Sequence, residues 1–159
     1  MASSDHLTSE GPLQFGLRAR DTDYADRPCA YGIAARDDGR IAVVKVTQPE
    51  ATWYDLPGGA IDPGEDEGQA LVREFGEETG LIVRPDVLIA RASQYMVKTD
   101  GAAVNNRSGL YIAILGGEDP ALKIEQDHTL EWLQPEEALK RLRHDSHAWA
   151  VAVWLRSPG

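Results

Sequence analysis

The sequence predicts a single α/β domain built as a sandwich, in which a mixed β-sheet lies between helices. Three observations lead to this fold class. The chain has 159 residues, which is the size of one ordinary domain. Hydrophobic residues make up 42% and charged residues 26% of it, a composition typical of a globular protein. Segments with strand and helix patterns interleave along the chain, and no internal repeat is present.

The first twelve residues differ from the rest in composition. Residues 1–12 are small, polar and without periodicity, so we expect them to form a flexible N-terminal tail. Residues 13–159 then form the one domain. The tail lacks the basic and apolar regions of a secretion signal, and no apolar run approaches the roughly 18 residues that span a bilayer. Because Cys29 is the only cysteine, no intramolecular disulfide can form, and we expect a cytoplasmic protein with no membrane partner.

Strand-like segments are found in both halves of the chain. Ala30–Val46 predicts a β-hairpin, because two apolar stretches flank the turn sequence Asp37-Asp38-Gly39. A short strand at Thr52–Leu56 ends at Pro57-Gly58-Gly59, which is turn chemistry. Further strands are expected at 88–97, 108–115 and 129–133, with a polar connection at about 99–107.

Three helices are expected. The first runs from about Asp66 to Thr79, because acids suit its positive end and Gly80 suits the C-cap position. The second covers Pro135–Leu142, where proline begins a segment with apolar residues at helical spacing. The third is amphipathic and is capped by Ser146.

The strongest functional pattern surrounds the first helix. Gly59 is followed after five residues by Glu65, and after seven more by Arg73-Glu74-Phe75-Gly76-Glu77-Glu78-Thr79-Gly80-Leu81. On a helix, Glu67, Glu74 and Glu78 share one face beside the apolar stripe. Such clustered acids repel one another unless a cation neutralises them, and Mg²⁺ prefers these oxygen ligands. The alternative is a solvated charged face, but such a face would need no glycine loop ahead of it.

This pattern matches every fixed position of the Nudix box, and the chain therefore resembles MutT-like hydrolases of the Nudix family. The one mild departure is Phe75, where the family usually has an aliphatic residue. The resemblance implies a Nudix-type α/β/α sandwich and a Mg²⁺ cofactor, with Mn²⁺ as a substitute. It also implies a role for each box residue: metal binding by the Gly58 carbonyl, Glu74 and Glu78, with Glu77 assisting; orientation of the acids by Arg73; and support of the loop by Glu65.

The resemblance further implies a reaction. Water attacks a phosphorus atom in a nucleoside diphosphate linked to a group X, and a carboxylate, for which we favour Glu74, accepts the proton. An oxidised or non-standard nucleoside triphosphate would give a monophosphate and pyrophosphate. Nucleotide sugars, dinucleoside polyphosphates and ADP-ribose are alternative substrates, between which the sequence does not choose.

Residues outside the box complete the expected site. Many family members recruit a carboxylate from a loop before a late strand, where Glu125 and Asp127 are the candidates and Asp127 is preferred as a metal ligand. Candidate substrate contacts are Arg27, Tyr54, Tyr95, Arg107 and Tyr111, through phosphate binding or stacking. The histidines are assigned no role, since their spacing indicates no metal set.

The charge of the chain limits its partners. A formal net charge of −10 disfavours duplex nucleic acid, which proteins bind through phosphate contacts, and a cap-removing enzyme would also need a basic groove. A small nucleotide-like diphosphate is the expected substrate, and a homodimer is possible. The rival hypothesis is a nucleotide-sensing module that does not cleave its ligand, but the intact set of acids disfavours it.

Overall fold

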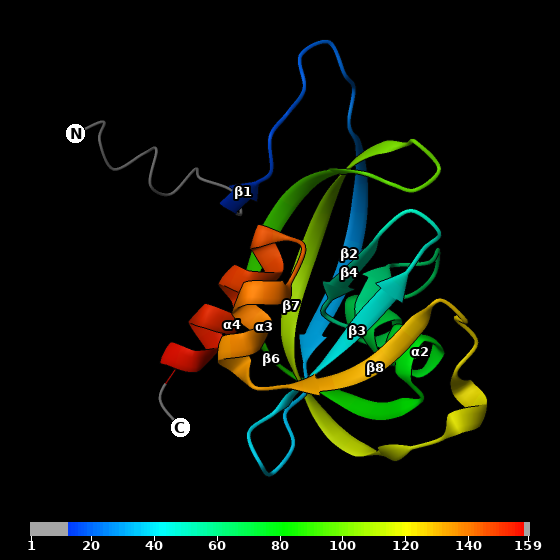
Figure 1. The fold of residues 1–159 in the computed structure, drawn as a ribbon, viewed down its shortest axis with the longest axis vertical. Coiled ribbons are helices and arrows are strands. Elements are labelled where there is room, and N and C mark those ends of the chain that lie inside the picture. Colours follow the sequence, from blue (N-terminus) through cyan, green and yellow to red (C-terminus); the bar gives the residue numbers. More distant parts are fainter. Residues whose placement is uncertain (1–12, 158–159) are drawn as a thin grey trace.

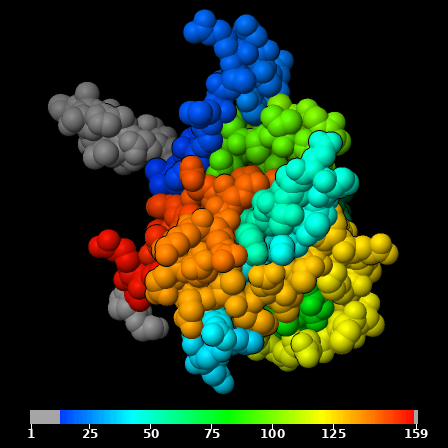
Figure 2. Space-filling model, in the orientation of Figure 1, coloured from blue at the N-terminus to red at the C-terminus, as the bar shows by residue number. Residues whose placement is uncertain are grey.

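The computed structural model describes residues 13–157, so the tail expected at residues 1–12 lies outside the described part of the chain. The elements, drawn in Figure 1, are β1 (Leu13–Phe15), β2 (Ala25–Ile33), β3 (Ile41–Thr47), β4 (Thr52–Asp55), β5 (Gly58–Ala60), α2 (Glu67–Thr79), β6 (Leu81–Val97), β7 (Ala103–Glu118), the short 3₁₀ helix η1 (Pro120–Leu122), β8 (His128–Leu133), α3 (Pro135–Arg141) and α4 (Asp145–Arg156). The segment between β1 and β2 projects from one end of the molecule in both the ribbon and the space-filling view (Figures 1 and 2).

The strands form two sheets. The larger has the order β1-β6-β7-β2-β5, and the smaller has the order β4-β3-β8. The larger sheet is mixed, because β1 is parallel to β6 and β2 is parallel to β7, whereas the other neighbours are antiparallel. Figure 1 shows α3 and α4 on one side of the strands and α2 on the other. The predicted sandwich with a mixed sheet is therefore confirmed.

Strand β2 separates two hydrophobic cores. Cys29, Tyr31 and Ile33 face the core that α3 and α4 cover, whereas Ala30 and Ala34 face the core beneath α2. This is the alternation that a strand buried on both faces requires. Arg27 has the parity of Cys29 and Tyr31, so its side chain lies on the α3–α4 side of the sheet.

The hairpin predicted for Ala30–Val46 was partly wrong. The turn itself is formed, since the Gly39 N–H donates to the Arg36 carbonyl at 2.9 Å. Pairing beyond the turn is limited to an isolated bridge between Ala35 and Ile41, after which β2 and β3 enter different sheets. Beyond the bridge the two strands pair with different neighbours, β2 with β7 and β3 with β8.

Strands β6 and β7 are longer than predicted. The polar connection expected at 99–107 contracts to a short turn, because Ala103–Arg107 pairs with the end of β6. Pro85 lacks the N–H that a central strand donates, so the sequence does not indicate a strand over the first half of β6. In the structure, bulges beside Pro85 interrupt the pairing with β7 and accommodate the missing N–H. Strands β1 and β5 have three residues each, too few to show a period in the sequence.

The box helix α2 is held at both ends by local contacts. Asp66 caps it by accepting the Gln69 N–H at 2.8 Å, and the Gln69 side chain accepts the Asp66 N–H at 2.9 Å, which is a reciprocal capping box. Gly80 ends the helix with φ 77°, and its N–H donates to the Gly76 carbonyl. The predicted helix is confirmed to within one residue. Within residues 13–157, no helix combines the length and the apolar character needed to cross a membrane.

Candidate active site

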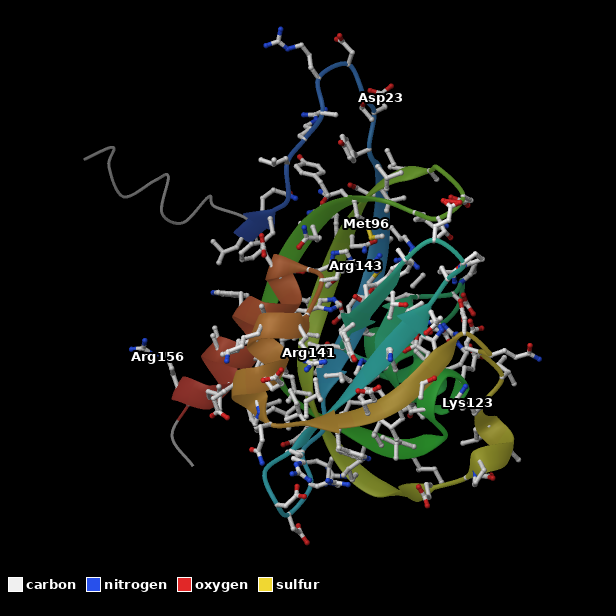
Figure 3. All side chains as sticks on the ribbon, viewed as in Figure 1. Asp23, Met96, Lys123, Arg141, Arg143 and Arg156 are labelled. Atoms are coloured by element: carbon white, nitrogen blue, oxygen red, sulfur yellow. The ribbon has the colours of Figure 1, made fainter. Side chains whose placement is uncertain are left out.

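A cavity of about 330 Å³ lies where the box meets the strands of both sheets. Its walls come from β2, β4, the loop into β5, α2, the β6–β7 turn and the loop before β8. The charged residues that line it are Arg27, Asp55, Glu74, Glu78, Lys98, Glu125, Asp127 and Arg143, together with His128. Met96 and Arg143, which both line the cavity, are near one another in Figure 3, whereas Asp23 and Arg156 lie at the periphery.

The glycines of the loop allow close approach of the box to the sheet. Gly58 has φ 145°, and a Cβ atom there would lie 2.2 Å from the Ala30 carbonyl oxygen, so only glycine fits. A Cβ atom on Gly59 would lie 2.8 Å from the carboxyl carbon of Glu74. The loop is anchored to β2 by the Gly32 N–H, which donates to the Pro57 carbonyl at 3.0 Å. The loop backbone thus contacts the acids of the helix directly.

Glu74 and Glu78 bring two carboxylates to the floor of this cavity. Glu78 is buried, at 6% exposure, and its Oε1 accepts the Gly58 N–H at 3.0 Å. Burial raises the pKa of Glu78 well above its usual range, the Glu74 charge adds to this, and the Gly58 N–H opposes it. Burial also raises the pKa of Glu74, against the opposing charge of Arg73. Two partly uncompensated carboxylates side by side are costly without a cation.

The donor set fits a divalent metal ion. Glu74 and Glu78 lie one helical turn apart and line the same cavity, and both offer the hard oxygen ligands that Mg²⁺ prefers. Burial of Glu78 beside Glu74 would be relieved by a bound cation. Mg²⁺ or Mn²⁺ could therefore be held by these two side chains and the carbonyl of the adjacent loop.

Arg73 joins the loop to the helix. Its guanidinium donates to both oxygens of Glu65 at 2.7 and 3.0 Å, and to the Ala60 carbonyl at 3.0 Å. It also contacts Glu74 at 2.9 Å and Glu77 at 3.2 Å. Glu65 most of all, and Glu74 after it, raise the pKa of Arg73, and Arg73 lowers the pKa of Glu65. Glu65, Arg73 and Glu77 are thus brought together beside the cavity but do not line it.

Arg27, on β2, supplies a cation to the lining of the cavity. Its Nη1 donates to the Asn106 side-chain oxygen at 3.0 Å and lies 3.2 Å from Cys29 Sγ. Within residues 13–157, no carboxylate lies within ion-pair distance of this half-buried guanidinium. Asn106 is in turn held by Met96, to whose sulfur it donates at 3.0 Å. A cation fixed by neutral partners remains able to bind an anionic ligand.

The loop before β8 brings a third group of ligand atoms. Glu125, Asp127 and His128 lie close enough together to hold a metal ion. His128 Nδ1 is 2.8 Å from Asp127, and its Nε2 is 3.5 Å from Oε2 of Glu78. The other oxygen of Asp127 accepts from the Gln48 side chain. The two candidate loop acids therefore both reach the site, and His128 connects their loop to the box helix.

Some residues singled out in the sequence lie elsewhere. Tyr54 packs under Arg141, 5.6 Å from its guanidinium, and lines no part of the cavity. Arg107 is exposed and pairs with Asp26 at 3.2 Å. Glu67 has the helical phase of Glu74, but its carboxylate is bound by Arg91 and Tyr111 and lines no part of the cavity. The expectation that the three acids cluster was therefore wrong for this residue.

Several cavity residues had no signal of their own in the sequence. Trp53 and Asp55 lie on β4, and Arg143 binds Asp55 at 2.8 and 3.3 Å and stacks on Trp53 at 4.4 Å. Burial raises the pKa of Asp55, and Arg143 opposes the shift. The alternation of Trp53 and Asp55 placed them on one face of a strand, but nothing indicated that this face meets the start of α4. His128 also lines the cavity beside the predicted Asp127, although the spacing of the histidines indicates no metal site.

Comparison with known proteins identifies related chains. The sequence model described as NUDIX domain matches residues 26–155. Among curated proteins, an RNA pyrophosphohydrolase of Sphingopyxis alaskensis is 44% identical over 55 residues, 35% of each chain. A putative 8-oxo-dGTP diphosphatase of Bacillus subtilis is 43% identical over 51 residues, 32% of this chain and 33% of that one. The chain thus matches about a third of the length of these two relatives.

Longer matches show lower identity. A MutT-like protein of Streptomyces ambofaciens is 28% identical over 115 residues, which cover 70% of this chain and 66% of the relative. Among solved structures, a NUDIX hydrolase from Nitrosomonas europaea superposes with a TM-score of 0.69 at 19% identity, covering 82% of this chain and 88% of that one. This last likeness concerns the fold alone.

Proposed function

The chain belongs to the NUDIX domain family, and on this basis we propose that it is a pyrophosphohydrolase of a small nucleotide. The observation that carries the proposal is that two carboxylates, Glu74 and Glu78, and the cation of Arg27 line the same cavity. Acids that can hold a metal ion, together with a cation that can bind phosphate, are what a metal-bridged diphosphate requires. The reaction is hydrolysis of a diphosphate linkage in a nucleoside diphosphate joined to a group X.

Mg²⁺ held by the Gly58 carbonyl, Glu74 and Glu78, with Asp127 from the loop before β8, would polarise the phosphate oxygens and stabilise charge on the leaving group. Arg27, which lines the same cavity, binds a phosphate oxygen. Water attacks phosphorus and the bond to the leaving phosphate breaks. Glu74 accepts the proton of the attacking water, as a positioned general base.

Arg73, Glu65 and Glu77 support this arrangement without lining the cavity. Arg73 orients Glu74, and Glu65 fixes Arg73 through a two-point contact. Glu77, at 3.2 Å from Arg73, assists metal binding from the helix face beside Glu74. Substitution of any of these residues would therefore change activity indirectly, by altering the position of Glu74 or of the loop.

A free nucleotide, such as an oxidised or non-standard nucleoside triphosphate, is the proposed substrate. The cavity volume of about 330 Å³ is at the lower end of the 300–1,000 Å³ that ligand pockets typically span, and so suits one compact ligand. The net charge of −10 disfavours a nucleic-acid strand. The names of the relatives include both an oxidised-nucleotide diphosphatase and RNA pyrophosphohydrolases, so the test must include both classes.

The test is a panel of substrates incubated with Mg²⁺ and analysed by chromatography for both products. The panel contains nucleoside triphosphates with oxidised and ordinary bases, nucleotide sugars, dinucleoside polyphosphates, ADP-ribose and 5′-triphosphate RNA. We expect a monophosphate and pyrophosphate from a nucleoside triphosphate, and no turnover by Glu78→Gln. Preference for RNA would replace the proposed substrate, and binding without cleavage of any compound would favour the nucleotide-sensing module.

A further inference from the structure

The backbone that leads into the Gly58–Gly59 loop is held from the far end of the sequence. We define the clamp segment as Arg143–His147, which comprises the end of the α3–α4 junction and the first turn of α4. The Arg143 N–H donates to the Tyr54 carbonyl at 2.8 Å, and the Arg143 guanidinium binds Asp55. His147 Nδ1 accepts the Leu56 N–H at 3.2 Å. Three consecutive residues before the loop are thus each bound by this segment.

Leu56 is the last of these anchored residues before the loop. Only Pro57 separates it from Gly58, and proline restricts the backbone on both sides of itself. The Pro57 carbonyl is held by β2, and the Gly58 N–H is held by Glu78. The direction of the Gly58 carbonyl is therefore set by contacts from β2, α2 and α4, and the contact from α4 is made by His147.

The surroundings of His147 favour a fixed acceptor. The ring is buried, at 2% exposure, and packs against Tyr31 with 4.3 Å between centroids and against the edge of His144 at 5.2 Å. Burial lowers the pKa of His147 well below its usual range, so the ring is neutral. Because Nδ1 accepts the Leu56 N–H, the proton lies on Nε2. A single tautomer in a packed site presents one acceptor in one place.

We propose that His147 is a positioning residue that orients the Gly58 carbonyl toward the metal ion. The role rests on the proposed function, since that function makes this carbonyl a metal ligand. A purely structural role would be met by any side chain that fills the same space. The positioning role requires an acceptor at the Nδ1 position, and this difference can be tested by substitution.

Asparagine and leucine separate the two roles. In His147→Asn, the side-chain oxygen occupies nearly the position of Nδ1 and can accept the Leu56 N–H. In His147→Leu, a side chain fills much of the space but leaves that N–H without an acceptor. His147→Phe also lacks the acceptor but keeps a ring against Tyr31. Circular dichroism selects the variants that fold, and either Leu or Phe is sufficient for the comparison.

The measurement is Mn²⁺ binding by the substrate-free protein, followed by the electron paramagnetic resonance signal of free Mn²⁺. Because outer-shell groups typically change metal affinity about 10- to 100-fold, and His147 acts one step further out, we expect Leu or Phe to weaken binding about 5- to 10-fold. The Asn variant should stay within about twofold of wild type by the same reasoning. Hydrolysis by the Leu variant should recover as Mn²⁺ is raised.

His144→Leu is the matched control: although His144 lies in the clamp segment and is buried beside His147, it makes no hydrogen bond to residues 54–59 in the described structure, and its ring comes only within 4.0 Å of Asp55. It should lower thermal stability and leave Mn²⁺ affinity within about twofold. Wild-type affinity in His147→Leu and His147→Phe would overturn the positioning role while leaving the proposed function intact. Equal weakening by Asn would also overturn it. Absence of Mn²⁺ binding by wild type would overturn the proposed function itself, and this role with it.

Discussion

Oε1 of Glu78 accepts the backbone N–H of Gly58 at 3.0 Å. This bond joins the box helix to the loop that precedes it, across twenty residues of sequence. It leaves Oε2 facing His128 at 3.5 Å. One oxygen of a buried carboxylate is therefore used to hold backbone, and the other remains available to a cation.

Glu78→Gln should stabilise the metal-free protein. The raised pKa of Glu78 means that, above its ordinary pKa, ionisation favours the unfolded state, so folding stability decreases as pH rises. The neutral amide removes this cost, and we expect the metal-free Tm at pH 7.5 to increase by about 2–4 °C, corresponding to roughly 1 kcal/mol. Thermal unfolding in EDTA measures it.

The same variant should lose its response to metal. Added Mg²⁺ should raise the Tm of wild type but not of Glu78→Gln, because metal binding stabilises only a protein that has the site. At pH 4, where the carboxyl is protonated in both states, the difference in Tm without metal should nearly vanish. A variant less stable than wild type at pH 7.5 would contradict the cost assigned to this carboxylate.

Gly59→Ala should impair activity more than stability. The added methyl would lie 2.8 Å from the Glu74 carboxyl carbon, so the flexible side chain would move rather than the fold. We expect kcat to fall at least about 10-fold, because moving the carboxylate forfeits part of the roughly 10²- to 10⁴-fold that a positioned general base contributes. Gly116→Ala is the control, since its nearest contact would be 3.6 Å. Steady-state kinetics and thermal unfolding of both variants make the comparison.

Arg73→Lys should destabilise the loop. Lysine cannot reproduce the two-point contact with Glu65 together with the bond to the Ala60 carbonyl. We expect a loss of about 1–3 kcal/mol in the free energy of unfolding, the range for hydrogen bonds to charged groups. Arg141→Lys, which alters an exposed pair with Glu137, should leave the free energy of unfolding nearly unchanged. Equal losses in urea unfolding would show that the Arg73 network has no special weight.

Arg27→Gln should weaken substrate binding. Removal of an unpaired cation from the cavity wall should lower kcat/KM about 10- to 100-fold, since a charged hydrogen bond contributes roughly 1.5–3 kcal/mol. Inorganic pyrophosphate should also inhibit the variant less than wild type. Arg156→Gln, at the periphery in Figure 3, is the control for net charge. An unchanged kcat/KM for Arg27→Gln would exclude a phosphate contact.

Acid should destabilise the protein through its buried histidines. Burial lowers the pKa of His144 to about 3, with Arg143 contributing, so the unfolded state alone takes up this proton below about pH 6.5. Stability contributed by neutral His144 is present above pH 6.5 and is lost as pH falls toward 3. Urea unfolding between pH 7 and 5 should show a shallower decline for His144→Asn than for wild type. An identical slope would contradict the assignment.

The box could be predicted from sequence because its geometry is local. The limits of α2, its C-cap Gly80 and the glycine loop depend on contacts within about twenty residues, and they agree with the structure to within one residue, Asp66 being the N-cap rather than the first helical residue. Contacts between distant segments could not be predicted. The clamp of Arg143 on Asp55 joins residues 88 apart, and no periodic pattern indicates which strand a helix end will meet.

The partners of charged side chains were also beyond the sequence. Glu67 has the helical phase of Glu74, yet Arg91 draws it away, and that arginine lies on a strand whose register depends on bulges. Conversely, His128 has no sequence signal of its own, and it lies in the site because it directly follows Asp127, whose carboxylate its ring contacts. The position of a residue on a helix thus limits the directions in which its carboxylate can point. Ion pairs with residues distant in sequence determine which of these directions the carboxylate takes.

The two-sided burial of β2 also limits how this domain can vary in length. Inserting or deleting one residue between Arg27 and Ile33 would reverse every later side chain, sending alanines toward the larger core and bulky residues into the space beneath α2. It would also place Arg27 and Tyr31 on opposite faces of the strand, so that they could no longer both line the cavity. At Asp37–Gly39, where the chain is exposed and the strands have already parted, extra residues would leave both cores in phase. Length changes in related chains should therefore accumulate at this turn and avoid the strand.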